Sequence, residues 1–147
     1  MPQTRPPAGR VLGLDLGEVR IGVAVCDPDR RLAVPMETIS AGAPADLQAV
    51  ARLVRHNDVT LVVVGHPVML SGRRGARARH AEEFADGLRG LVQVPVVLHD
   101  ERLSTAEADR MLQEAGAGGR ERRRAVDRSA AAVILQAYLD EQAGARA

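Results

Sequence analysis

The segment VLGLDLGEVRIGVAV, residues 11–25, constrains the fold of this chain more than any other stretch. Its two β-rich runs, Val11–Leu16 and Ile21–Cys26, flank a short turn and predict a β-hairpin. The first run contains one charged residue, Asp15, between two leucines. An ionised carboxylate in apolar surroundings is costly unless a cation or hydrogen-bond donors accompany it. The Asp15 carboxylate therefore requires a partner.

Two kinds of partner are compatible with the sequence around Asp15. Lysine is not one of them, because all 20 basic residues of the chain are arginine. The nearest basic residue is Arg20, across the predicted turn, so an ion pair with Arg20 or hydrogen bonds to turn amides is one interpretation. The other is a metal ion, provided that further carboxylates converge on the same place.

Length and composition predict one globular domain. The chain has 147 residues, 46% of them apolar and 27% charged, which is ordinary for a soluble domain with a single core. We expect a flexible tail at residues 1–9, a domain at 10–142 and a C-terminal tail at 143–147. The proline-rich start lacks the apolar core of a signal peptide, and no apolar run approaches the roughly 18 residues of a membrane span. These features predict a cytoplasmic protein.

The order of elements predicts an α/β fold with a five-stranded mixed sheet. Three strands come first and are followed by alternating helices and strands. After the hairpin we expect strands at Leu32–Ile39, Leu61–Val64 and Val94–Leu98, with the segment around His66 as a loop after the fourth strand.

Apolar spacing, turns and a capping box predict four helices. The first follows Pro44 and has Leu47, Val50, Ala51 and Val54 on one side. The second has Ala81, Phe84, Ala85, Leu88 and Leu91 on one stripe, the third is opened by Ser104 and Glu107, and the last spans Ala125–Leu139.

Three acidic residues stand where such a sheet could bring them together. Asp15 is in the first strand, Glu101 follows the fifth, and Asp127 is in the first turn of the last helix. The carboxyl ends of parallel strands usually open on the ligand-binding crevice of an α/β sheet. Converging carboxylates without lysine would repel one another unless divalent cations bind between them, and hard oxygen ligands suit Mg²⁺ or Mn²⁺. Two such ions about 4 Å apart can activate water and stabilise the leaving oxygen of a phosphodiester.

Basic residues are concentrated in two places, although the net charge is only +1. Residues 71–80 contain four arginines and no acid, and residues 120–128 contain five arginines and two acids. Such local clusters suggest focused contacts with anions, whereas solvated arginines on loops are the alternative. Phe84 and Tyr138 are the only aromatic residues apart from histidine, which argues against platforms that stack splayed bases.

Several motifs, in order along the chain, resemble the YqgF family of RuvX-like proteins, which are described as pre-16S rRNA nucleases and Holliday-junction-resolvase-like proteins. The resemblance covers residues 10–140 and implies a ribonuclease H-like fold with metal-dependent hydrolysis of nucleic-acid phosphodiesters. The matching segments are Gly13-Leu-Asp-Leu-Gly17, Arg20-Ile-Gly-Val-Ala-Val25, Val63-Val-Gly65 with Pro67, Asp100-Glu-Arg-Leu-Ser-Thr105, and Val126-Asp127 with Ile134-Leu-Gln-Ala-Tyr-Leu139.

The resemblance implies that Asp15, Glu101 and Asp127 are the catalytic, metal-binding acids. Asp100 is the alternative to Glu101, because adjacent strand residues point to opposite faces and the sequence does not fix the register. His66 departs from the family pattern, which more often has an apolar residue there; a plain loop histidine and a residue that reaches the site are both possible. Cys26, where the family often has serine, is interpreted as a packing residue.

The same crevice suggests roles for the arginines. Arg102 could grip a phosphate or neutralise Asp100. Contacts to the phosphate backbone would position nucleic acid without reading its sequence. The candidate substrate-binding residues are Arg20, Arg73, Arg74, Arg102, Arg122, Arg123 and Arg124.

Among functions, the resemblance favours processing of the 5′ end of precursor 16S rRNA, with cleavage of four-way DNA junctions as the alternative. No residue distinguishes these substrates, and junction cleavage would favour a two-fold homodimer. An ATP-binding module of the actin and hexokinase superfamily is a rival, opposed by the lack of a second phosphate motif. A non-catalytic assembly factor is another, opposed by the presence of all three acids.

Overall fold

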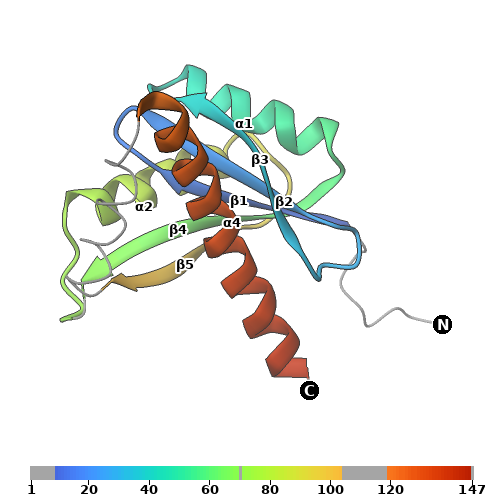
Figure 1. Ribbon diagram of the computed structural model, residues 1–147. Helices are drawn as coiled ribbons and strands as arrows, with labels where there is room; N and C mark the ends of the chain where they lie inside the picture. Colours follow the sequence, from blue (N-terminus) through green and yellow to red (C-terminus); the bar gives the residue numbers. More distant parts are fainter. Residues whose placement is uncertain (1–8, 70, 104–118, 147) are drawn as a thin grey trace.

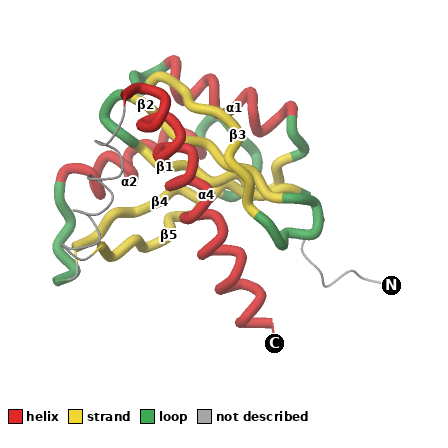
Figure 2. Tube along the Cα trace, viewed as in Figure 1, coloured by secondary structure: helices red, strands yellow, loops and turns green. Residues whose placement is uncertain are grey.

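A computed structural model describes residues 9–69, 71–103 and 119–146, without the side chains of residues 69, 102–103, 119–129 and 145–146. It forms one sheet with helices on both faces (Figures 1 and 2). No helix among these residues is long and apolar enough to cross a membrane. The elements are β1 (Arg10–Leu16), β2 (Arg20–Cys26), β3 (Ala33–Ser40), α1 (Ala45–His56), β4 (Val59–Met69), α2 (Ala76–Arg89), β5 (Val96–Leu103) and α4 (Gly119–Arg146).

The sheet has five strands in the order β3-β2-β1-β4-β5 and is mixed, as the sequence predicts. β1 and β2 form the predicted antiparallel hairpin, whose turn is closed by a hydrogen bond from Gly17 N to Arg20 O at 2.9 Å. β3 is antiparallel to β2, whereas β4 is parallel to both β1 and β5. The carboxyl ends of the three parallel strands β1, β4 and β5 therefore lie at the same end of the sheet.

Strands β4 and β5 extend farther than their apolar runs indicate. Their parallel ladder continues past Val64 and Leu98 through the polar residues beyond, to the pair Met69 and Leu103. The segment around His66 is thus strand, so the expectation of a loop there is wrong, and Glu101 lies within β5 rather than after it.

Other expected helices differ at their ends. Leu91 does not continue the apolar stripe of α2, because the helix ends at Arg89 before Gly90 and Leu91 is 48% exposed. The last helix is longer than expected and extends from Gly119 to Arg146. The helix expected from Ser104 lies outside the described residues.

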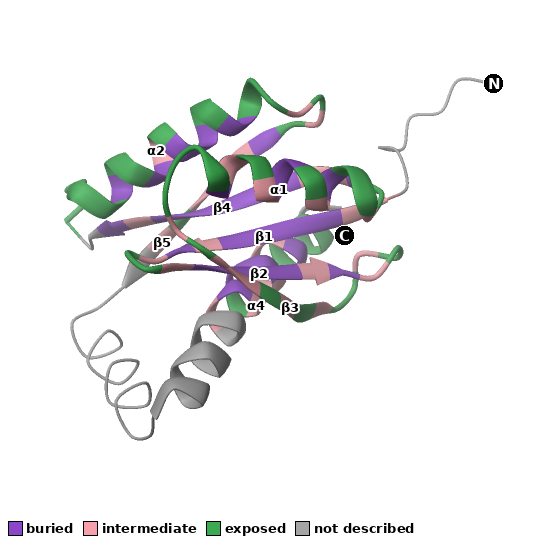
Figure 3. Cartoon of the chain, turned by 90° about the horizontal axis from the view of Figure 1, so that it is seen from above, coloured by how far each residue is buried: buried purple, intermediate pink, exposed green. Residues whose placement is uncertain are grey.

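The helices lie on opposite faces of the sheet, α2 on one and α4 on the other (Figure 3), and the alternation of side chains along the strands divides the core into two clusters. Even-numbered residues of β1, such as Leu12 and Leu14, pack against α1 and α2, with Phe84 and Leu88 in the same cluster. Odd-numbered residues of β1 face α4, as do Val63 of β4 and Cys26 of β2. Cys26 is buried, as its predicted packing role requires, and its sulfur accepts a hydrogen bond from Val11 N.

Glycines bring α4 close to the middle of the sheet. A Cβ added at Gly13 would lie 2.7 Å from Leu135 Cβ and 3.3 Å from the Ala131 carbonyl oxygen. A Cβ added at Gly65 would lie 2.8 Å from Ile134 Cδ1. The small residues of the sheet and helix therefore fix the distance of α4 from β1 and β4.

We expect Gly13→Ala to destabilise the protein more than Gly65→Ala. At Gly13 the methyl group meets atoms next to the helix backbone, so α4 must move; overpacking of this kind costs about 1–3 kcal/mol. At Gly65 it meets the far end of the Ile134 side chain, which can rotate away. Urea unfolding of both variants measures the difference, and equal free energies of unfolding would contradict the close approach at Gly13.

Candidate functional site

Asp15 and Glu101 lie on the face of the sheet that α4 covers. Asp15 follows Gly13 by two residues in β1, so it shares the orientation toward α4. In β5, Val97 packs in the α4-side cluster and His99 makes an edge-to-face contact with Tyr138 of α4. Glu101 continues this alternation, and both acids are only partly exposed. The structure thus brings two of the three expected acids to one face.

The strand positions beside Asp15 on this face are glycines. β4 separates β1 from β5, and its residue next to Asp15 along the ladder, one beyond the Leu14–Val64 pair, is Gly65. On the other side of Asp15, the residue opposite in β2 is Gly22. Asp15 is therefore flanked by glycine on both neighbouring strands, and the side chain of Ile134 in α4 lies over Gly65.

The charge of Asp15 affects the protonation of Glu101. The pKa of Glu101 is raised from 4.5 to about 7, first by burial and second by the negative charge of Asp15. Both causes disfavour a second carboxylate charge at this place. A divalent cation would remove the conflict, so the donor set fits Mg²⁺ or Mn²⁺, whose preferred ligands are carboxylate oxygens and water.

The raised pKa of Glu101 predicts a pH dependence of stability in metal-free buffer. An acid whose pKa is higher in the folded than in the unfolded state stabilises the fold below its unfolded pKa. This stabilisation is lost as the pH rises from about 4.5 to about 7. Glu101→Gln, which does not titrate, should therefore match the wild type near pH 5. At pH 8.5 it should be more stable by about 1–2 kcal/mol, allowing for partial exposure. Urea unfolding at both pH values measures this, and a pH-independent difference would contradict it.

Asp127, the third expected acid, lies in α4. Its side chain lies outside the described part, but the backbone places it one helical turn before Ala131, which is buried against Gly13. Among the side chains that the structure describes, no group of three histidine, cysteine or acidic residues could hold a metal ion. The described part of the candidate site therefore consists of two potential ligands, Asp15 and Glu101.

Asp100 and His66 lie on the opposite face, toward α2. They are directly paired in the β4–β5 ladder, and His66 Nδ1 is 3.3 Å from Asp100 Oδ1. His66 is 9% exposed, and its Nε2 is 2.6 Å from Glu82 Oε2 in α2. Of the two candidate acids in β5, Glu101 is therefore the one that faces Asp15. His66 does not share that face.

The candidate arginines occupy different environments. Arg20 begins β2 and by alternation is on the face of Gly22 and Asp15. Arg73 is exposed, whereas Arg74 donates two hydrogen bonds to the Glu82 carboxylate at 2.9 and 3.0 Å. The side chains of four others, Arg102, Arg122, Arg123 and Arg124, lie outside the described residues.

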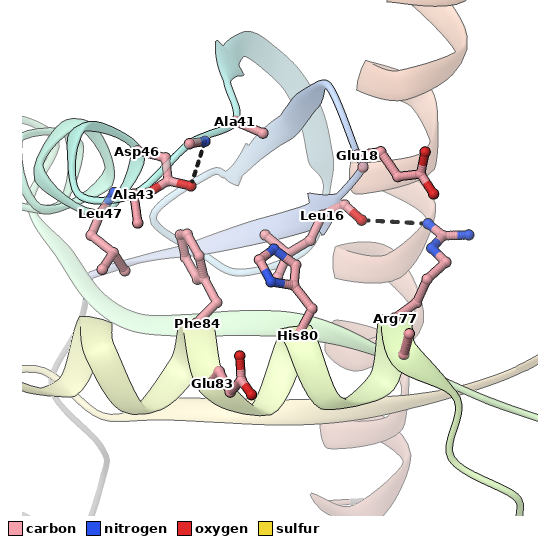
Figure 4. A pocket seen from close by; sticks show the side chains of 13 residues that line it. Leu16, Glu18, Ala41, Ala43, Asp46, Leu47, Arg77, His80, Glu83 and Phe84 are labelled. Atoms are coloured by element: carbon pink, nitrogen blue, oxygen red, sulfur yellow. Dashed lines mark hydrogen bonds between the residues drawn. The ribbon is translucent and has the colours of Figure 1, made fainter.

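Arg77 was not among the arginines singled out from the sequence. It is in the first turn of α2 and donates to the Leu16 carbonyl at 3.4 Å, at the end of β1 (Figure 4). Its position in the arginine cluster at residues 71–80 marks it as a possible anion contact. Its contact with β1 could not be predicted from the sequence, because it depends on how α2 packs against the sheet.

A cavity of about 510 Å³ opens beside this contact, between the β1–β2 turn, the start of α1 and α2 (Figure 4). Its lining includes Arg77 and His80 but also three acids, Glu18, Asp46 and Glu83. The buried Asp46 carboxylate accepts hydrogen bonds from Gly42 N and Leu47 N. The cavity is on the α1–α2 side of the sheet, whereas Asp15 and Glu101 face α4, and its acids disfavour phosphate. The paired acids are therefore the stronger candidate site.

Comparisons with known proteins agree on one family. The sequence profile of the RuvX family, described as Holliday junction resolvase, matches residues 9–141. A Corynebacterium jeikeium protein named "Putative pre-16S rRNA nuclease" is 46% identical over 141 residues, covering 95% of this chain and 91% of the relative. A protein of the same name from Anaeromyxobacter sp. strain Fw109-5 is 48% identical over 132 residues, covering 89% and 96%.

Solved structures show the same fold. RuvC of Thermus thermophilus in complex with a Holliday junction substrate superposes with a TM-score of 0.53 at 15% identity, covering 92% of this chain and 96% of that one. A second structure of this RuvC gives a TM-score of 0.51 at 13% identity, covering 92% and 96%. At this identity the likeness concerns the fold, which is ribonuclease H-like as expected.

Proposed function

Because this chain belongs to the RuvX family, we propose that it is a metal-dependent endonuclease that hydrolyses phosphodiester bonds of structured nucleic acid. We propose precursor 16S rRNA as the substrate, cleaved at its 5′ end. The observation that carries the nuclease proposal is the pair Asp15 and Glu101 on the α4 face, where burial and then the charge of Asp15 raise the pKa of Glu101. A divalent cation would stabilise both carboxylates, and divalent cations are what metal-dependent phosphodiester hydrolysis uses.

In the proposed site, Asp15, Glu101 and Asp127 hold Mg²⁺ or Mn²⁺. When bound, such ions activate a water molecule and stabilise the charge that develops on the phosphate and the leaving oxygen. Gly22 and Gly65 flank Asp15 without a side chain of their own, and the contact of α4 with Gly13 places the helix that contains Asp127 over β1.

Arginines supply the other half of the proposed site. Arg20 lies on the face of Asp15, whereas Arg73 and Arg77 lie on the α2 side, in the loop before α2 and in its first turn, near the carboxyl ends of β4 and β1. They bind phosphates of the backbone, which orients the substrate without selecting a base sequence. Arg74 contributes less to binding, because its guanidinium group already donates hydrogen bonds to the Glu82 carboxylate.

A second candidate substrate is the four-way DNA junction. It is favoured by the description of the family and by the fold shared with a RuvC that was solved with such a junction. The names of the most similar relatives favour precursor 16S rRNA instead. A homodimer would match the two-fold symmetry of a junction and is not needed for cleavage of rRNA.

One side-by-side assay tests the proposal. Purified protein is incubated with a precursor 16S rRNA fragment and with a four-way junction, in Mg²⁺, in Mn²⁺ and with a chelator. We expect metal-dependent cleavage of the rRNA fragment near the mature 5′ end. Cleavage of the junction alone would support the second candidate, and no cleavage of either substrate would reject the nuclease.

Replacing Arg122, Arg123 and Arg124 together by glutamine is expected to weaken binding to all sequences alike. These residues lie in α4 just before Asp127 and are proposed to hold substrate phosphates. Each phosphate contact contributes about 0.7–0.9 to the slope of log K against log salt, so the slope should become shallower. Turnover should fall as well, because the scissile phosphate is less well positioned.

Binding isotherms at several salt concentrations measure this effect. The control replaces two arginines, Arg52 and Arg55, by glutamine; both are exposed on α1, on the other side of the sheet, and their loss should leave binding and slope unchanged. Superimposed salt plots for the triple variant and the wild type would show that these arginines are merely solvated.

A further inference from the structure

The His66 side chain connects three elements beneath the proposed site. His66 belongs to β4, and its ring lies between Glu82 of α2 and Asp100 of β5, with ring nitrogens at 2.6 and 3.3 Å from the two carboxylates. The histidine is 9% exposed, so these contacts are partly shielded from water. A polar ring at a buried strand position is costly without partners, and here both nitrogens have one.

Asp100 links this cluster to the proposed site. It is adjacent to Glu101, and the two side chains leave β5 on opposite faces. β5 is an edge strand that pairs only with β4, so the sheet holds its carboxyl end from one side. A side-chain contact at Asp100 therefore restricts the same backbone from which Glu101 extends toward Asp15.

Arg74 closes the outer end of the cluster. Its guanidinium donates twice to Glu82, and Val68 of β4 forms an isolated antiparallel bridge with Arg74. The pKa of Glu82 is lowered, chiefly by its hydrogen bond with His66 and further by Arg74, so Glu82 stays ionised as the common partner. The loop before α2, the ends of β4 and β5, and α2 itself are thus joined through four side chains.

We propose that His66 is a positioning residue that holds the end of β5, and hence Glu101, at the spacing from Asp15 that metal binding requires. This inference rests on the proposed function of Asp15 and Glu101. His66 touches neither substrate nor metal; it acts through Asp100 and Glu82 from the other face of the sheet. The loss of this contact leaves the acids in place but less well ordered.

The test compares His66→Leu with His66→Gln, which keeps a polar group able to contact a carboxylate. The control is His56→Leu, at an exposed histidine of α1. Mn²⁺ affinity is measured by electron paramagnetic resonance without substrate, and kcat and KM are measured with the rRNA fragment. We expect His66→Leu to weaken Mn²⁺ binding about threefold to tenfold and to lower kcat, with KM for the nucleic acid nearly unchanged. His66→Gln should recover part of both losses, and His56→Leu should match the wild type.

Two results would overturn the inference while the proposed function stands. The first is a His66→Leu variant with wild-type Mn²⁺ affinity and kcat, even if its melting temperature falls, since His66 would then serve stability only. The second is a raised KM with unchanged kcat, which would make His66 a substrate contact. A wild-type protein that neither binds Mn²⁺ nor cleaves would instead reject the proposed function, and this inference with it.

Discussion

Asp15→Asn is expected to reduce cleavage by about a thousandfold or more, because it removes a negative charge from the proposed metal site while keeping the side-chain volume. The neighbouring strand positions on its face, Gly22 and Gly65, offer no side chain in its place. Single-turnover cleavage with saturating protein measures the chemical step. Burial and then repulsion by Asp15 raise the pKa of Glu101, and the substitution should remove the second of these causes.

The fold of Asp15→Asn should remain intact, so its melting temperature in metal-free buffer at pH 8 should equal or exceed that of the wild type. Addition of Mn²⁺ should raise the melting temperature of the wild type more than that of the variant. Asp29→Asn, at an exposed turn residue, is the matched control and should cleave normally. Near-normal turnover of Asp15→Asn in both Mg²⁺ and Mn²⁺ would reject the metal site and favour an ion pair as the role of Asp15.

Much of the fold could be predicted because local pattern and tertiary structure agree. The hairpin at residues 11–26 has β-rich runs around a glycine turn, and the apolar run at 61–64 marks a central parallel strand. The polar ends of β4 and β5 could not be predicted in the same way. Residues such as His66 and Asp100 are in strand conformation because their neighbours pair with them, and this pairing is not encoded in the apolar pattern.

The candidate site was only partly predictable for the same reason. The three acids could be named from their motifs, but the choice between Asp100 and Glu101 could not be made from the sequence. Adjacent residues of β5 point to opposite faces of the sheet, and the register of β5 decides which of the two acids faces Asp15. The partner of Arg74 also depends on packing, since Glu82 is eight residues away on the next helix. Charge patterns show where arginines gather, whereas tertiary contacts decide which of them remain available to a phosphate.

The adjacent acids of β5 provide the sharpest test of this assignment. We expect Glu101→Gln to lower kcat by about a hundredfold to a thousandfold, the range found when one charge-stabilising group is lost from an active site. Asp100→Asn should lower it by less than about tenfold, because the amide oxygen still faces His66 and only positioning is disturbed. Each substitution removes one charge and keeps the volume, so the pair differs only in which face of the sheet is changed.

The Mn²⁺ dependence of the two variants separates the possible explanations further. Loss of a metal ligand should abolish or strongly weaken Mn²⁺ binding in Glu101→Gln, whereas Asp100→Asn should bind Mn²⁺ with an affinity close to that of the wild type. If the large losses of affinity and turnover occur instead in Asp100→Asn, β5 has the opposite orientation at the site. The contact of Asp100 with His66 would then be broken in the active protein. Equal losses in both variants would mean that the two carboxylates share the metal, which requires β5 to twist between them and is incompatible with the continuous β4–β5 ladder.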